Sequence, residues 1–388
     1  MAREGQGAAM TGSELSIGCK YLLPLAGLQA LIEVLATRGY LVLGPALRDG
    51  AIIYDEITTL ADLPAGWTDQ QDAGRYQLAR RDDNALFGYA VGPQSWKKFL
   101  LPPTETIFTA HRTADGFAIA ERAPPPPKFA FLGVRACELA AIAIQDKVLL
   151  NGPYTDTSYQ SRRSKNFLIA VNCGTAGGTC FCVSMQTGPA AQSGFDLALT
   201  ELITPGAHEF LVTAGTREGA EILATLPTQP ATPNHIAQAD AIIAHTAANM
   251  GRTLDTTGLK DRLQANLTAP QWDDVAARCL SCGNCTMVCP TCFCTSVEDH
   301  SDLSGQTATR TRRWDSCFTL DFSYIHGGSV RAEPASRYRQ WLTHKLANWW
   351  DQFGTSGCTG CGRCVTWCPV GIDITAEAAA IGSENGNT

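Results

Sequence analysis

The sequence predicts an α+β protein, in which an N-terminal α/β domain with a mixed sheet precedes a mostly α-helical domain. Three observations predict this class. An apolar strand–helix–strand pattern spans residues 128–171, two cysteine runs of the same spacing lie beyond residue 278, and an amphipathic helical pattern at 336–350 separates those runs. The expected organisation is a disordered N-terminus at 1–14, the α/β domain at 15–255 and a helical ferredoxin-like domain at 256–388.

Length and composition limit the class of protein. A chain of 388 residues is long enough for two domains, each with its own core. The formal net charge of −7 argues against nucleic acid as a partner, and no apolar run is long enough to cross a membrane. Residues 1–13 lack the apolar core of a signal peptide. Most of the 16 cysteines stand at metal-ligand spacing, which is typical of a reducing compartment, so we expect a cytoplasmic protein.

The N-terminal elements are predicted from periodicity. Residues 21–37 repeat apolar side chains at helical spacing. Residues 41–43 and 51–54 predict a hairpin about the turn Arg48-Asp49-Gly50. A strand-like segment is expected within 86–103, and Pro124–Pro127 predicts a stiff connector.

A strand–helix–strand unit is predicted in the middle of the chain. Lys128–Val134 and Asn166–Val171 have the composition of buried strands, and Glu138–Leu150 between them has a helical pattern. Ligands in such sheets gather at the carboxyl ends of the strands. Cys137 follows the first strand and Cys173 the second, so we expect both thiols on one rim. The α/β pattern continues at 197–209 and 218–226, and a linker at 227–233 precedes helices at 234–250 and 259–265.

A third metal site is predicted at that rim. Cys173 opens a glycine-rich segment that also holds Cys180 and Cys182. A phosphate-binding loop is the rival interpretation, but no Lys-Ser/Thr pair follows and G-x-G-x-x-G is absent. We predict a [4Fe–4S] cluster held by Cys137, Cys173, Cys180 and Cys182, with an inert thiol cluster as the alternative. The helix amides after Cys137 suit an anionic cluster, whereas the Glu138 carboxylate opposes it unless its side chain turns to solvent.

The two cysteine runs carry the clearest chemical signal. Residues 279–290 and 358–369 both follow C-x₂-C-x₂-C-x₃-C-P, the ligand run of bacterial [4Fe–4S] proteins. Three thiolates of a run reach one cubane, and in two-cluster proteins the fourth serves the other cluster. The predicted ligands of cluster A are therefore Cys279, Cys282, Cys285 and Cys368, and those of cluster B are Cys358, Cys361, Cys364 and Cys289. A single run could be a zinc site; two copies, each with its proline, argue against that.

The connection between the runs, residues 290–357, is longer than a compact two-cluster ferredoxin needs. It holds three further thiols, Cys292, Cys294 and Cys317. These thiols either ligate a metal, with the fourth position of the third cluster among the options, or pack against cluster B and tune its potential. The sequence leaves both interpretations open.

Several motifs together resemble one family. They are Gly133-Val-Arg-Ala-Cys137-Glu, Asn172-Cys173 with Gly177-Gly-Thr-Cys180-Phe-Cys182, Cys289-Pro-Thr-Cys-Phe-Cys294 and Trp314-Asp-Ser-Cys317, in this order. The chain from about Tyr21 to Thr375 resembles the iron–sulfur β subunit of the soluble, NAD(P)-linked [NiFe] hydrogenases, or sulfhydrogenases. It is similar also to the A subunit of anaerobic sulfite reductase.

The resemblance implies a role in electron transfer. It implies a cytoplasmic complex with a flavin-containing NAD(P)H reductase subunit and the small and large [NiFe] subunits. The chain itself lacks the cysteine pairs of a [NiFe] subunit, a sirohaem pattern and a dinucleotide fingerprint. We therefore expect a relay through three [4Fe–4S] clusters. The alternatives are an electron-transfer subunit of an anaerobic sulfite reductase, or a stand-alone iron–sulfur enzyme that uses the middle-domain cluster.

Overall fold

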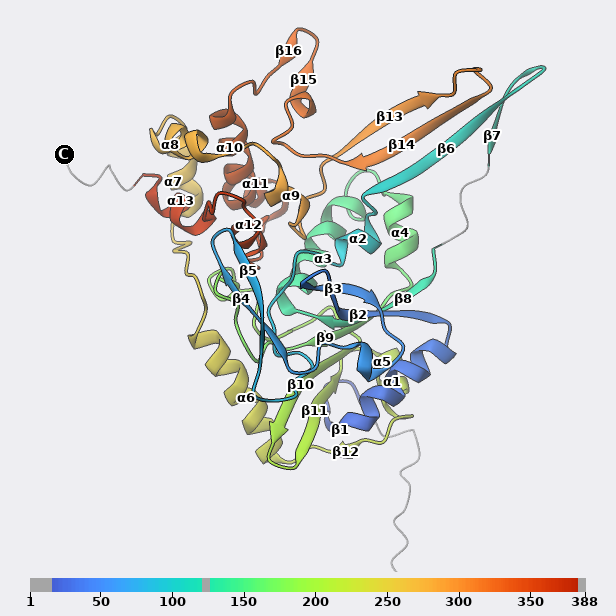
Figure 1. Ribbon diagram of the computed structural model, residues 1–388, viewed down its shortest axis with the longest axis vertical. Helices are drawn as coiled ribbons and strands as arrows, with labels where there is room; N and C mark the ends of the chain where they lie inside the picture. The colour runs from blue at the N-terminus through green and yellow to red at the C-terminus, as the bar shows by residue number, and fades with distance from the viewer. Residues whose placement is uncertain (1–15, 121–125, 383–388) are drawn as a thin grey trace, which may run out of the picture.

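The computed structural model describes residues 16–120 and 126–382, shown as a ribbon in Figure 1. The disorder expected for residues 1–14 lies outside these ranges, as do Pro124 and Pro125 of the proline connector. Within them the fold combines a large mixed sheet with a helical C-terminal part, as the sequence predicts.

The large sheet has eight strands in the order β12-β1-β11-β10-β9-β8-β2-β3. Its four central strands β10, β9, β8 and β2 run parallel, whereas the outer strands pair antiparallel. In that order the strands are Gln229–Pro230, Lys20–Pro24, Ala207–Ala214, Leu197–Thr204, Phe167–Val171, Lys128–Val134, Tyr40–Arg48 and Ala51–Glu56. The predicted β2–β3 hairpin and the parallel pairing of β8 with β9 are confirmed.

Alternation along β8 builds a core on each face of this sheet. Ala130 and Leu132 belong to a buried cluster on one face, with Leu28 of α1 (Leu25–Thr37). Phe129 and Phe131 belong to the cluster on the other face, with Leu139 of α3 (Ala136–Leu149). Successive side chains of a strand point to opposite faces, so a strand covered on both sides is apolar throughout. The other helices of this part are α2 (Lys97–Leu100), α4 (Thr157–Arg163), α5 (Arg217–Leu223) and α6 (Pro233–Ala248).

Two N-terminal predictions are wrong in part. The helix expected over 21–37 begins only at Leu25, because Lys20–Pro24 forms strand β1. The segment 86–103 contains no strand, and α2 is its regular element. Four of its backbone groups are paired with distant side chains: the amides of Leu86 and Phe87 donate to Glu201, and the carbonyls of Phe87 and Tyr89 accept from Arg135. Such long-range partners are invisible to a local pattern.

The C-terminal part is mostly helical around its own core. The predicted helix at 336–350 is present as α10 (Pro334–Thr343), a π-helical turn η3 (His344–Asn348) and α11 (Trp349–Phe353). Trp341, Leu342 and Leu346 are buried in that core. The remaining helices are α7 (Leu259–Ala265), α8 (Gln271–Arg278), α9 (Asn284–Met287), α12 (Arg363–Thr366) and α13 (Ile374–Ala380). None of the helices in the described ranges is both long and apolar enough to span a membrane.

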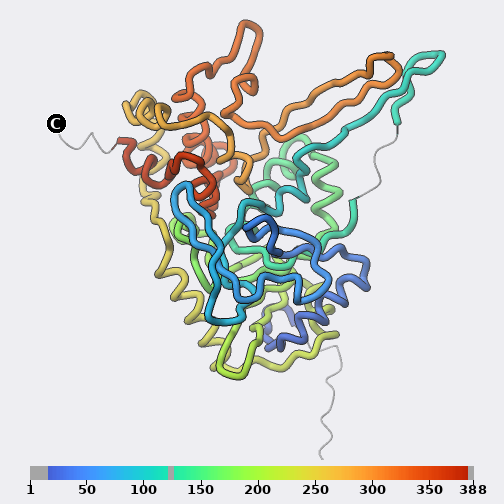
Figure 2. The backbone as a smooth tube through the Cα atoms, in the orientation of Figure 1, coloured from blue at the N-terminus to red at the C-terminus, as the bar shows by residue number. Residues whose placement is uncertain are grey.

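A four-stranded antiparallel arm projects from the body, as the tube in Figure 2 shows clearly. Its order is β13 (Thr295–Ser301), β14 (Thr307–Trp314), β6 (Thr104–Thr113) and β7 (Gly116–Ala120). Neither β13 nor β14 was predicted from the sequence. Since β14 pairs with β6, the arm joins strands from both sides of the boundary expected near residue 255. The division into domains at that residue therefore stays a prediction.

Smaller elements complete the described chain. They are the hairpin β4 (Trp67–Asp72) and β5 (Arg75–Arg80), the pair β15 (Tyr324–Ile325) and β16 (Gly328–Ser329), and the short 3₁₀ turns η1 (Leu60–Asp62) and η2 (Asp321–Ser323). The β4–β5 hairpin contacts the C-terminal part, where Gly74 N–H donates to Val365 O over 3.1 Å.

Candidate metal centres

The two cysteine runs fold alike. In the first, Ser281 and Gly283 have left-handed φ values of 51° and 72°, and in the second, Gly360 and Gly362 have 65° and 75°. The amide of Ser281 donates to Cys279 Sγ over 3.4 Å, and that of Gly360 to Cys358 Sγ over 3.4 Å. A short helix then begins, α9 or α12, which carries the third cysteine of its run. The repeated spacing in the sequence thus encodes a repeated backbone turn around the thiols.

Two cavities are lined by the thiols of these runs. Cavity A is bounded by Cys279, Cys282, Cys285, Cys364 and Cys368, among others. Cavity B is bounded by Cys289, Cys358, Cys361 and Cys364, among others. Each predicted ligand set lines one cavity, with the fourth cysteine contributed by the other run. The ligand sets themselves stay a prediction.

Burial decides the state of these thiols. It raises the pKa of the Cys285 and Cys364 thiols well above their ordinary values. A thiol in such a place stays neutral unless a metal cation binds and deprotonates it. Cys289 differs, because a hydrogen bond from Cys292 and the nearby Lys345 ammonium hold its pKa well below the ordinary value.

The arrangement of the thiols suits a multi-iron cluster. In the described part of the chain, no three Cys, His, Asp or Glu side chains converge closely enough to hold a single metal ion. A cubane is ligated at its corners, so its four sulfurs stand around a volume instead of a point. Cavities A and B have this form, and their donors are the thiolates that iron–sulfur clusters require.

The third predicted site lies beside cavity B. Cys137 and Cys182 belong to one buried apolar group together with Cys361 of the second run. Cys180 Sγ lies 3.9 Å from Cys361 O. Cys173 follows β9. Burial raises the pKa of the Cys180 and Cys182 thiols, and the nearby thiol of Cys173 raises both further, so these sulfurs lie close together. The structure therefore brings the four predicted thiols into one region, next to the second run.

Two buried arginines flank this region. Arg135 and Arg363 are almost fully buried. Arg135 Nε and Arg363 Nη1 have no hydrogen-bond partner in the described structure, and these side chains lie beside the thiols of Cys173 and Cys361. Unpaired donors next to thiols fit an anionic thiolate cluster, which would accept from them.

Glu138 differs from expectation. Its side chain does not turn to solvent but is 1% exposed. Glu138 Oε1 pairs with Arg363 Nη2 over 2.5 Å, and Glu138 Oε2 accepts from Tyr54 and Trp96 over 2.7 and 3.1 Å. Because Arg363 neutralises the carboxylate, it no longer opposes an anionic cluster. The same pair joins α3, which contains Cys137, to the turn between Cys361 and Cys364.

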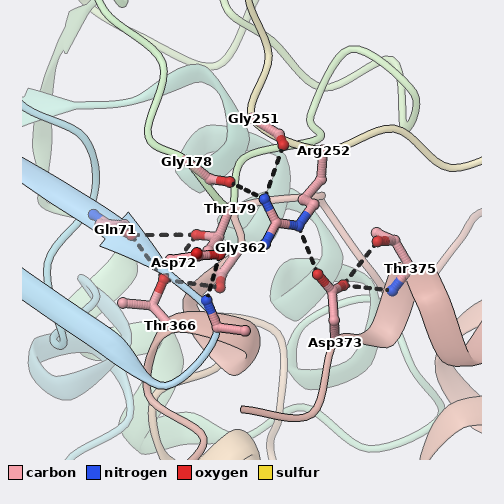
Figure 3. Close-up of polar contacts among 11 residues, drawn as sticks. Gln71, Asp72, Gly178, Thr179, Gly251, Arg252, Gly362, Thr366, Asp373 and Thr375 are labelled. Carbon is pink, nitrogen blue, oxygen red and sulfur yellow. Dashed lines mark hydrogen bonds and ion pairs between the residues drawn. The ribbon is translucent and has the colours of Figure 1, made fainter.

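Hydrogen bonds and ion pairs hold the loop of residues 173–182, called the third-site loop below, against the second cysteine run (Figure 3). Arg252 donates to Asp373 Oδ2 and to Gly178 O, each over 2.6 Å, and it also pairs with Asp72. Thr179 and Thr366 share a hydrogen bond of 2.7 Å, and Thr366 donates to Gln71 over 2.8 Å. The Phe181 amide donates to Gly360 O over 2.8 Å. The loop that carries Cys180 and Cys182 is thus fixed from both sides.

The three spare thiols lie elsewhere. Cys292 adjoins Cys289, and Cys294 accepts a hydrogen bond from the Cys317 amide. All three thiols lie within electrostatic range of Lys345, and Cys317 lies also near Cys285 of cavity A. Cys137 remains the predicted fourth ligand of the third site.

Four residues of the centres were not singled out from the sequence: Arg135, Arg252, Lys345 and Arg363. For Arg363 a signal existed, since it stands between the ligands Cys361 and Cys364. For Lys345 there was none, because its thiol partner Cys289 is 56 residues away in the chain.

Comparisons with known proteins agree with this geometry. Residues 278–372 match the family model of the 4Fe-4S dicluster domain, so the chain is an iron–sulfur protein of the dicluster class that carries [4Fe–4S] clusters. It is 32% identical over 280 residues to sulfhydrogenase 2 subunit beta of Pyrococcus furiosus, with 71% of this chain and 79% of that protein covered. The chain belongs to the sulfhydrogenase β-subunit family, which confirms the resemblance predicted from its motifs. No solved structure matched.

Proposed function

We propose that this chain is the electron-transfer subunit of a cytoplasmic hydrogenase. It would relay electrons through three [4Fe–4S] clusters between a flavin-containing NAD(P)H reductase subunit and the [NiFe] small and large subunits. Membership of the sulfhydrogenase β-subunit family and the dicluster match support an iron–sulfur electron-transfer role. The three clusters, the partners and the compartment are part of the proposal.

The observation that carries the proposal is the continuity of the thiols. Cys364 lines both cavity A and cavity B, and Cys361 of cavity B packs against Cys137 and Cys182 of the third site. Bound [4Fe–4S] clusters supply one-electron transfer. Each predicted set has four thiolates, which would leave no iron position open for a substrate. The residues of this chain therefore hold and insulate the centres, and their arrangement favours a relay over a catalytic site.

The partners are tested by isolating the native complex from its own source under anaerobic conditions. We expect a flavin-containing subunit and a [NiFe] pair to purify with the chain, and the complex to couple H₂ oxidation to NAD(P)⁺ reduction. Isolation of the chain alone, with its own turnover independent of H₂, would contradict the proposal. A sirohaem-containing partner would place the chain in a sulfite reductase instead.

The third site is tested by iron content. Three cubanes hold about twelve iron atoms per chain. Cys137→Ser should lower that count and remove one EPR signal, while the two dicluster signals persist. The matched control is Cys19→Ser, because Cys19 is exposed and lies outside every predicted set. Full iron content in Cys137→Ser would exclude Cys137 as a ligand.

A further inference from the structure

Lys345 is a buried cation whose ammonium contacts a predicted cluster ligand. It is 5% exposed, and its Nζ donates to Cys289 Sγ and to Thr291 Oγ1, each over 3.1 Å. Within residues 16–120 and 126–382, no carboxylate lies within ion-pair distance of it. A buried ammonium is costly by several kcal/mol unless an anion compensates it. The available anion is the thiolate of Cys289.

The backbone of Lys345 reaches the other end of the same ligand set. Its carbonyl accepts from Gly357 N–H over 2.8 Å and from Ser356 Oγ over 3.2 Å, directly before Cys358. Lys345 lies in the π-helical turn η3 between α10 and α11. Single π turns inside helices occur often at functional sites, because the extra residue reorients the side chains around it. One residue therefore links the fourth cysteine of the first run to the start of the second.

A second buried cation lies close by. Lys97 is 4% exposed, and its Nζ lies 3.8 Å from the centre of the Trp314 ring and 3.4 Å from Met287 O. It too has no carboxylate within ion-pair distance among the described residues. Lys97 and Lys345 both lie within electrostatic range of Cys289, so they favour whichever state of cavity B carries more negative charge.

Cavity A provides an internal comparison. Its fourth cysteine, Cys368, accepts from the Ile372 amide over 3.3 Å, where Cys289 accepts from Lys345. In the described structure no Lys or Arg side chain donates to a thiol of Cys279, Cys282, Cys285 or Cys368. The two predicted ligand sets therefore share their turn geometry, but only the fourth cysteine of cluster B accepts a hydrogen bond from a lysine in the described structure.

We propose that Lys345 is a positioning residue that raises the reduction potential of cluster B relative to cluster A. This inference rests on the proposed function, namely on a [4Fe–4S] cluster at Cys358, Cys361, Cys364 and Cys289. Reduction adds one negative charge to a cluster, and a buried cation that donates to a ligating sulfur stabilises the more negative state. Lys345 thus makes cluster B the better electron acceptor of the two.

The test is an anaerobic redox titration of the full chain in its complex, monitored by EPR. The signal of cluster B is first assigned as the one lost in Cys358→Ser, because Cys358 lines cavity B and not cavity A. In Lys345→Met we expect this signal to titrate at lower potential. The equilibrium constant for reducing cluster B should fall at least roughly tenfold, which corresponds to about 59 mV for one electron. The cluster A signal should shift less, because Lys345 acts on Cys285 through space and donates no hydrogen bond to it, and the iron content should stay unchanged. Lys345→Arg, which keeps the charge, should shift the cluster B signal less.

Controls separate the possible failures. Lys147→Met is the control. Lys147 is exposed, and its one hydrogen bond in the described structure goes to Phe353 O, so this variant should shift neither signal. An unchanged cluster B potential in Lys345→Met with full iron would overturn the inference. If Lys345→Met fails to assemble, Lys345→Gln keeps a donor without the charge, and a wild-type potential there would overturn it equally. Absence of any signal that depends on Cys358 in the wild type would instead refute the proposed function.

Discussion

The two cysteine runs share one backbone turn but lie in different surroundings. Leu280 of the first run is 63% exposed, whereas Thr359, at the same place in the second, is 2% exposed. Cys282 is exposed and Cys361 buried. The first run faces solvent, and the second is enclosed by the third-site loop, by α3 and by Lys345. The spacing of the cysteines therefore sets the local turn, while distant residues set the environment of each centre.

The largest effect expected from this comparison is the loss of one cluster. If each fourth cysteine serves the cavity of the other run, Cys368→Ala should damage cluster A and leave cluster B, although Cys368 belongs to the second run. Cys289→Ala should do the reverse. Cluster-resolved EPR on both variants measures this, with Cys19→Ser as control. Loss confined to cluster B in Cys368→Ala would reverse the assignment.

The next effect concerns Arg363 and its counterpart Asn284. Arg363→Asn leaves the Glu138 carboxylate buried without its cation, which costs roughly 3–5 kcal/mol of unfolding free energy. Asn284 donates to the Trp367 carbonyl, so Asn284→Ala should cost about 1 kcal/mol. Anaerobic guanidinium unfolding of both variants gives the two values.

A double variant sharpens this test. Adding Glu138→Gln to Arg363→Asn removes the stranded charge and should recover part of the lost stability. Equal losses of unfolding free energy in Arg363→Asn and Asn284→Ala would show that the Glu138–Arg363 pair contributes no more to stability than the Asn284–Trp367 hydrogen bond does.

A smaller effect is expected at the left-handed residue of the second run. A Cβ at Gly360 would lie 2.6 Å from Phe181 O and 2.7 Å from Cys182 N, both backbone atoms of the third-site loop. Gly360→Ser should therefore cost roughly 2–4 kcal/mol, from left-handed strain and overpacking together. It should also reduce the iron of the third site, because the loop must move. A thermal melt and an iron assay measure both. Wild-type values would mean that the loop does not pack on this turn.

These contrasts show how far the sequence alone could lead. The cysteine spacing, the β8–α3–β9 unit and the helix at 336–350 depend on local pattern, and each was predictable. The arm strand β14, the Glu138–Arg363 pair and the Lys345–Cys289 contact depend on partners 56 or more residues apart in the chain, since β14 pairs with β6. Glu138 illustrates the limit: its position after Cys137 was predictable, but the cation that neutralises it stands in the other ligand run.

The smallest effect is expected from the reciprocal change, Ser281→Gly. Ser281 holds the same left-handed turn with φ 51°, and its neighbour Leu280 faces solvent. Glycine relieves the strain of a Cβ in that conformation, about 1–2 kcal/mol, but it loses more conformational entropy on folding, about 0.5–1 kcal/mol. The two terms nearly offset each other, so stability should change by less than about 1 kcal/mol and the iron content should not change. A loss as large as that of Gly360→Ser would mean that the Ser281 hydroxyl, which lies 3.4 Å from Arg337 Nη2, holds the first run in place, and that the first run is as tightly constrained as the second.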